Sequence, residues 1–181
     1  REAGHTSTHI AGLLDPELFA HEPERIQRLV DFLGSARVCE LVHDLAPASE
    51  GAVWLKALQY FHEQTERDWD GEWHRDSQFG RQDPLLERAY ASSTTAVHFR
   101  VAFLPDDRLE LVPGTHARWD SDEELAIRKG PLRASAAMRG SVRVALEPGD
   151  ACVFHAWTIL RATYRRAPPR RTLDGMFRYG E

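Results

Sequence analysis

The sequence predicts a mostly β protein with helices at its N-terminal end, built as an antiparallel sandwich or jelly roll. After Pro47, short apolar or alternating segments follow one another, and turns rich in Gly and Pro separate them. The chain shows neither the strand–helix alternation of a parallel sheet nor a glycine-rich phosphate loop. We expect its 181 residues to form a single domain, with a helical part at 1–47 and a β core at 53–181.

Three segments are expected to be helical. Apolar residues recur every three or four positions in 26–33 and again in 38–45, and Gly34 between them is a suitable helix stop. A third helix should begin after Ser121, because Ser121 and Glu124 have the spacing of a capping box.

Six segments are expected to be strands. In 95–104 the residues alternate, with Val97 and Phe99 on one face and His98 and Arg100 on the other. The remaining expected strands are 53–61, 109–112, 142–146, 151–160 and 171–179.

The composition is that of a globular protein without a nucleic-acid or membrane partner. The formal charge is −5 and the pI is near 6.0, which argues against a dedicated nucleic-acid binder. No apolar run approaches the roughly 18–20 residues of a membrane span. Cys39 and Cys152 are too few and too far apart for a disulfide framework, so we expect reduced, buried thiols in a cytoplasmic protein. The sequence does not indicate an oligomeric state.

The triplet His74-Arg75-Asp76 is the most informative feature of the chain. On a strand, residues two apart point to the same face, with their Cα atoms about 6–7 Å apart. One imidazole nitrogen of His74 and one carboxylate oxygen of Asp76 can therefore reach a single metal ion. Taken alone, the triplet has a second interpretation, in which His74 and Asp76 are unrelated side chains on a surface loop.

Three later segments add to this triplet. They are Leu-Val-Pro-Gly-Thr-His at 111–116, Glu-Pro-Gly-Asp-Ala-Cys-Val-Phe-His-Ala-Trp at 147–157 and Pro-Arg-Arg-Thr-Leu at 169–173. Together with His-Arg-Asp-Ser-Gln-Phe at 74–79, and in this order, they resemble the phytanoyl-CoA dioxygenase family of Fe(II)/2-oxoglutarate oxygenases. The resemblance covers roughly residue 53 to the C-terminus.

This resemblance implies a double-stranded β-helix, the jelly roll of cupin-like proteins, with Fe(II) held by two His and one carboxylate. Such a triad leaves positions open for 2-oxoglutarate, the co-substrate, and O2. His74 and Asp76 match the first two ligands, and both are catalytic by the same resemblance. Arg171 matches the arginine that binds the far carboxylate of 2-oxoglutarate, a role that suits the fork of a guanidinium. Arg170, the preceding residue, is the alternative candidate for this role. The other interpretation of Arg170 and of Arg171 is a solvated cation on the surface.

The sequence departs from the family at the second His, where it has Leu160, which has no donor atom. His155 lies five residues away, so on a regular strand it would face the other side, and we expect a structural role for it. His98 and Arg100 are expected to line the pocket, and His116 to help fix its loop. The carboxylate is retained, so the chain lacks the pattern of the halogenating relatives.

Three functions are compatible with these residues. The first is an oxygenase that hydroxylates or otherwise oxidises a small organic molecule, impaired by the missing His. The second is a non-catalytic jelly-roll relative that has lost iron and acts as a binding or partner protein. The third, less favoured, is a cupin-like metal-dependent isomerase or lyase that does not use 2-oxoglutarate. The sequence does not indicate the substrate.

Overall fold

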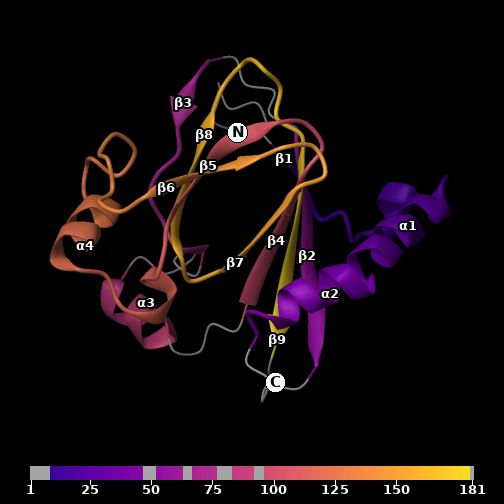
Figure 1. Cartoon of the computed structure of the whole chain (residues 1–181), viewed down its shortest axis with the longest axis horizontal. Coiled ribbons are helices and arrows are strands. Elements are labelled where there is room, and N and C mark those ends of the chain that lie inside the picture. The colour runs from indigo at the N-terminus through magenta and orange to yellow at the C-terminus, as the bar shows by residue number, and fades with distance from the viewer. Residues whose placement is uncertain (1–8, 47–51, 63–66, 77–82, 92–95, 180–181) are drawn as a thin grey trace.

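Two antiparallel sheets form the body of the protein (Figure 1). The computed structural model describes residues 9–46, 52–62, 67–76, 83–91 and 96–179. The larger sheet has the order β1 (His9–Ala11), β2 (Val53–Phe61), β9 (Thr172–Tyr179), β4 (Ala96–Ala102) and β7 (Ala151–His155). The smaller sheet has the order β3 (Trp69–Asp70), β8 (Ile159–Tyr164), β5 (Asp106–Val112) and β6 (Val142–Leu146). The predicted mostly β jelly-roll class is confirmed.

The N-terminal helices cover the outer face of the larger sheet. α1 (Pro23–Leu33) and α2 (Ala36–His43) follow a 3-10 turn, η1 (Pro16–Phe19), and lie beside β2, β4 and β9 in Figure 1. Leu33 and Val42 pack against Val97 and Phe99 of β4 in the main core. The alternation predicted for β4 is therefore confirmed, and its other face, with His98 and Arg100, points between the sheets.

Two helices lie near the smaller sheet, and only one of them was predicted. α4 (Asp122–Lys129) begins at the expected capping box, in which Ser121 and Glu124 each accept a backbone N–H from the other. α3 (Pro84–Ala91) was not predicted. The sequence does carry a start signal for it, because the carboxylate of Asp83 accepts the Leu85 N–H in front of the first turn.

The single strand predicted over 151–160 is wrong. The chain leaves the larger sheet after β7, turns at 156–158 and enters the smaller sheet as β8. The turn is closed by the Thr158 N–H, which donates to the His155 carbonyl at 2.9 Å. An apolar run that changes sheets has the same local pattern as a continuous buried strand, and only the pairing partners distinguish the two.

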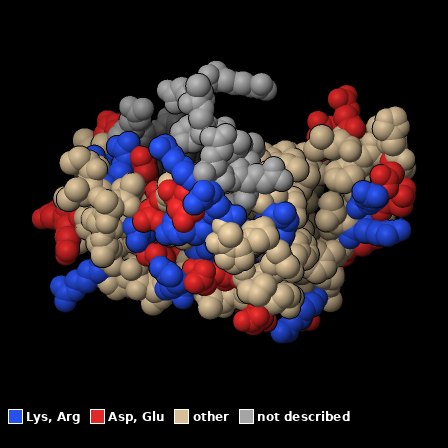
Figure 2. All heavy atoms as spheres, turned by 90° about the horizontal axis from the view of Figure 1, so that it is seen from above, with Lys and Arg blue, Asp and Glu red and all other residues tan. Residues whose placement is uncertain are grey.

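The surface has the character expected of a globular protein, but the two thiols are less buried than predicted. On the face seen in Figure 2, basic and acidic side chains are intermixed rather than gathered into a basic patch. Cys39 and Cys152 are both unpaired and only partly buried. Within the described residues, no helix is both long and apolar enough to cross a membrane.

Candidate functional site

A cavity of about 450 Å³ between the two sheets brings together four of the polar residues singled out above, namely His74, Asp76, His98 and Arg100. Its lining residues are His9, Ala57, Gln59, Phe61, His74, Asp76, His98, Arg100, Phe154, Leu160, Ala162, Tyr164, Asp174 and Met176. A more open depression of about 560 Å³ beside α4 is lined mainly by charged surface residues and contains no histidine. We therefore locate the candidate site in the cavity between the sheets.

His74 and Leu160 lie directly opposite each other at this cavity. The two residues form an isolated antiparallel bridge in which each N–H donates to the other's carbonyl at 2.9 Å. Residues paired in this way have Cα atoms about 5.5 Å apart and side chains on the same face. Position 160 is therefore adjacent to His74, and its leucine side chain is buried among Leu109, Leu111 and Phe154.

The side chains of His74 and Asp76 converge. His74 Nε2 lies 3.2 Å from Asp76 Oδ1, and His74 Nδ1 lies 2.7 Å from the carbonyl oxygen of Glu72. A carbonyl only accepts, so Nδ1 carries the proton and neutral His74 directs the Nε2 lone pair toward the carboxylate. Two acceptors facing each other in this way fit a shared cation, which is a proton or a metal ion.

The ionisation of both groups reflects this contact. Burial lowers the pKa of His74, but the hydrogen bond and charge of Asp76 outweigh it, so the pKa is raised overall. Burial acts to raise the pKa of Asp76, but the neighbouring imidazoles His98 and His74 outweigh it and hold the pKa far below its usual range. Asp76 is thus an anion throughout the physiological pH range.

His98 approaches Asp76 from the larger sheet. Its Nε2 lies 2.7 Å from Asp76 Oδ2, the oxygen that His74 does not contact. The two imidazoles therefore flank different carboxylate oxygens. In the part of the chain that the structure describes, no group of three or more His, Cys, Asp or Glu is arranged to hold a metal ion. The donors present thus fit a metal with two protein ligands, His74 and Asp76, rather than a complete triad.

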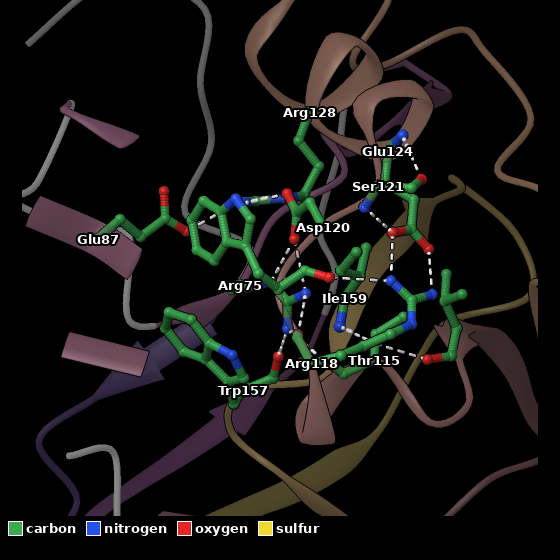
Figure 3. A network of polar contacts seen from close by, with 12 residues as sticks. Arg75, Glu87, Thr115, Arg118, Asp120, Ser121, Glu124, Arg128, Trp157 and Ile159 are labelled. Carbon is green, nitrogen blue, oxygen red and sulfur yellow. Dashed lines mark hydrogen bonds and ion pairs between the residues drawn. The ribbon is translucent and has the colours of Figure 1, made fainter. Parts of the chain in front are cut away.

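The middle residue of the triplet, Arg75, fixes this segment in the protein (Figure 3). Its buried guanidinium pairs with Asp120 at 2.6 Å, donates to the carbonyls of Thr115 and Trp157, and lies 4.9 Å from the Trp157 ring. Asp120 is also bound by Arg128 of α4. Arg128 in turn pairs with Glu87 of α3 at 3.0 Å and Lys129 does so at 2.6 Å. This buried network joins the triplet to both helices beside the smaller sheet.

The Pro-Gly-Thr-His loop is held mainly by its threonine. The Thr115 hydroxyl donates to the Val112 carbonyl at 2.7 Å and accepts the Ile159 N–H at 2.9 Å, which fastens the loop to the start of β8. Gly114 before it has a positive φ of 80°. His116, expected to fix the loop, lies 5.6 Å from the ring of His155. Sequence reasoning thus missed Thr115 as the main anchor.

His155 occupies a structural position. Its Nε2 is 3.0 Å from the Tyr179 hydroxyl, and its Nδ1 accepts the Trp157 N–H at 3.1 Å. Burial, followed by the neighbouring His116 and His98, lowers the pKa of His155 to about 4. With both ring nitrogens engaged, this histidine is not placed to replace a ligand at position 160.

The two candidate arginines lie in different surroundings. Arg171 donates to the main-chain carbonyls of Arg170 and His62. Arg170 is fully buried, lies 4.6 Å from the Phe61 ring and has Asp106 at 3.5 Å. Among the described residues, no group accepts a hydrogen bond from its guanidinium.

A second buried guanidinium reaches the cavity itself. Arg100 pairs with Asp174, its cross-strand neighbour on β9, at 2.5 Å, and lies 5.5 Å from the Phe61 ring. Burial lowers its pKa, but Asp174 outweighs this and raises it overall. Arg100 Nη1 and Asp174 Oδ1 both lack a partner within the described residues. The sequence placed Arg100 in the pocket, but its pairing with a residue 74 positions away could not be read from local patterns.

Solved structures with the same fold are known. EvdMO1 matches 98% of this chain and 37% of its own at 18% identity, with a TM-score of 0.62. SnoN, a non-heme α-ketoglutarate-dependent epimerase from nogalamycin biosynthesis, matches 100% of this chain and 68% of its own at 18% identity and a TM-score of 0.62. EctD from S. alaskensis with bound Fe matches 98% of this chain and 59% of its own at 15% identity and a TM-score of 0.63.

These likenesses concern the fold, and the chain spans only 37% of EvdMO1 and 59% of EctD. No curated protein matches the sequence. A model of one protein family, described as Phytanoyl-CoA dioxygenase, matches residues 3–172.

Proposed function

Because this chain belongs to the phytanoyl-CoA dioxygenase family, we propose that it is an Fe(II)- and 2-oxoglutarate-dependent oxygenase acting on a small organic molecule. The observation that carries the proposal is the convergence of His74 Nε2 and Asp76 Oδ1, 3.2 Å apart at the cavity. In such enzymes, iron and 2-oxoglutarate together supply the oxidising chemistry from O2.

His74 and Asp76 would hold the iron as its two protein ligands. The bond from His74 Nδ1–H to the Glu72 carbonyl presents Nε2 as a donor, in the way that outer hydrogen bonds orient metal-bound imidazoles. Asp76 supplies the negative charge. With Leu160 in place of a third ligand, one more coordination position is left to water or co-substrate, and weaker iron binding follows.

The far carboxylate of 2-oxoglutarate requires a cation inside the protein. The resemblance assigns this role to Arg171, whose guanidinium already binds two carbonyls. Arg170 fits better, because its buried guanidinium has no hydrogen-bond acceptor, and the buried hydroxyl of Thr172, two residues further on, also lacks a partner. Arg170 itself does not line the cavity, but Phe61, which it contacts, does. We assign the carboxylate to Arg170, with Arg100 beside it at the cavity wall.

The test is turnover under Fe(II). Purified protein should convert 2-oxoglutarate to succinate, and Asp76→Ala should abolish this. Arg170→Met should raise the Kd for 2-oxoglutarate, measured by calorimetry with Fe(II) under anaerobic conditions, at least tenfold more than Arg171→Met does. The opposite order would return the anchor to Arg171. Absence of both iron binding and succinate release would refute the oxygenase.

A non-catalytic binding protein is the second candidate, and the residue opposite His74 favours it. Leu160 is only 5% exposed and packs into an apolar cluster, so the place of a ligand is filled by hydrocarbon. On this alternative the wild-type protein binds no iron, and Leu160→His creates iron binding. Structural zinc sites derive about 10–16 kcal/mol from four ligands, so one imidazole is worth about 2.5–4 kcal/mol, or roughly 100-fold in affinity, enough to bring binding that is too weak to detect in the wild type into the measurable range. If Leu160→His does not raise iron affinity, position 160 is not a ligand position.

A further inference from the structure

Besides His74, two histidines line the cavity, His9 and His98, and His98 is the one with a ring nitrogen 2.7 Å from Asp76. His98 lies on β4, between β9 and β7 in the larger sheet, where its register partners are Met176 on β9 and Phe154 on β7. Its ring stacks on that of Phe154 at 5.1 Å with an interplanar angle of 16°. The position of this ring is thus set by the larger sheet, independently of the segment that carries His74 and Asp76.

The contact between His98 and Asp76 connects the two sheets at the site. His98 Nε2 lies 2.7 Å from Asp76 Oδ2, while Oδ1 faces His74. The torsion about the Cβ–Cγ bond of an aspartate has only a broad intrinsic preference, so the contacts of its two oxygens determine its orientation. With His98 at Oδ2, the other oxygen is held toward His74 before any metal arrives.

We propose that His98 is a positioning residue for the metal site: it holds Asp76 Oδ2, keeps Oδ1 beside His74 and so offsets part of the affinity lost with the third ligand. The proposal rests on the proposed function, because it assumes that His74 and Asp76 bind a metal ion. A role as a ligand is a different claim, since the two imidazoles flank different oxygens of Asp76.

The structural reason for the effect is preorganisation. In a site with three protein ligands, two imidazoles restrain the metal and the carboxylate together. In a site with two, the orientation of Asp76 decides whether both donors reach the metal at the same time. Replacing the outer partners of metal ligands typically reduces affinity by about 10- to 100-fold, and a site short of one ligand should lie at the upper end of that range.

The experiment measures Co(II) affinity, as an oxygen-stable substitute for Fe(II), by calorimetry without 2-oxoglutarate. His98→Leu should weaken binding about 10- to 100-fold. His98→Gln should recover most of the affinity, because a glutamine amide at this position can donate a hydrogen bond to Oδ2, which lies 2.7 Å from the imidazole it replaces. His43→Ala, which removes an exposed imidazole of α2 away from the cavity, is the matched control and should leave the affinity unchanged. Thermal unfolding of each variant confirms that it is folded.

The same variants are then measured in the Leu160→His background. There the third ligand restrains the site, so His98→Leu should weaken binding less than it does in the wild type. An unchanged affinity of His98→Leu in the wild type would overturn the proposal. An equal loss in His98→Gln and His98→Leu would also overturn it, because the imidazole itself would then be the ligand.

Failure of the proposed function gives a different result. If the wild-type protein binds no Co(II) while Leu160→His does, the two-ligand iron site is refuted, and the comparison of His98→Leu with His98→Gln in that background still decides the role of His98. If neither protein binds Co(II), both proposals fall.

Discussion

Replacing Arg75 by methionine tests whether the buried network of Figure 3 holds the segment with His74 and Asp76 in place. Methionine keeps most of the side-chain length but removes the charge and all donors. The side chains of Arg75 and Asp120 are both 0% exposed, so water cannot take over the lost bonds. Removing one partner of a buried ion pair typically destabilises a protein by about 3–5 kcal/mol.

The structure places the expected loss within this range. Asp120 keeps Arg128, whose Nε and Nη2 lie 2.7 Å and 2.6 Å from Oδ2, so its charge is not left alone. The carbonyls of Thr115 and Trp157, however, lose a buried donor, at about 1 kcal/mol or more each. The two carbonyls contribute about 2 kcal/mol, and the lost Arg75–Asp120 pair about 2 kcal/mol more, since Arg128 still compensates Asp120. The expected loss is about 4 kcal/mol, which for a chain of this size lowers the melting temperature by about 10 °C.

The assay is urea unfolding followed by tryptophan fluorescence, together with a thermal melt. Arg25→Met is the control, because Arg25 pairs with Glu22 at 2.5 Å and both side chains are exposed, at 63% and 48%. An exposed pair contributes about 1 kcal/mol or less. If Arg75→Met destabilises the protein no more than Arg25→Met does, Arg75 is not the anchor that the contacts indicate.

Three further predictions concern single positions. Gly71→Ala places a Cβ 2.5 Å from the carbonyl oxygen of Ala162, and this clash should lower the free energy of unfolding by about 1–3 kcal/mol in urea titrations. An unchanged midpoint of the titration would mean that β3 shifts freely. Ser121→Ala removes the N-cap of α4 and should lose about 1 kcal/mol, and a loss below the error of the titration would contradict the capping box seen with Glu124. The pKa of His155 is lowered from its ordinary value of 6.5 to about 4 in the folded protein. The contribution of the neutral imidazole to folding stability is therefore complete above pH 6.5 and is lost as the pH falls toward 4. Between pH 6.5 and 4, the wild type should lose about 2 kcal/mol more stability than His155→Asn does, after allowance for the partial exposure of His155. Parallel plots of stability against pH for the two proteins would rule out a lowered pKa.

The features predicted correctly from the sequence are those that a local pattern determines. The alternation in β4 identified both its core face and its cavity face, and the capping box located the start of α4. The spacing of His74 and Asp76 was enough to anticipate that their side chains converge. In each case the information lies within a few consecutive residues.

The features that were missed depend on long-range pairing. The break between β7 and β8 follows from which sheet each half joins, and the local sequence is silent on this. The approach of His98 to Asp76 requires that strands from different sheets face each other, and the pairing of Arg100 with Asp174 requires the register between β4 and β9. Knowing the order of the strands would have brought these residues together before any side chain was placed.

The bridge between His74 and Leu160 has a consequence for how this site changes over generations. Its two hydrogen bonds use only main-chain atoms, so they do not depend on which side chain stands at position 160. A leucine there leaves the backbone frame of the site in place. Some leucine codons differ from a histidine codon by a single base. A histidine at position 160 is therefore one mutational step away, and it would stand opposite His74 on the same main-chain bridge.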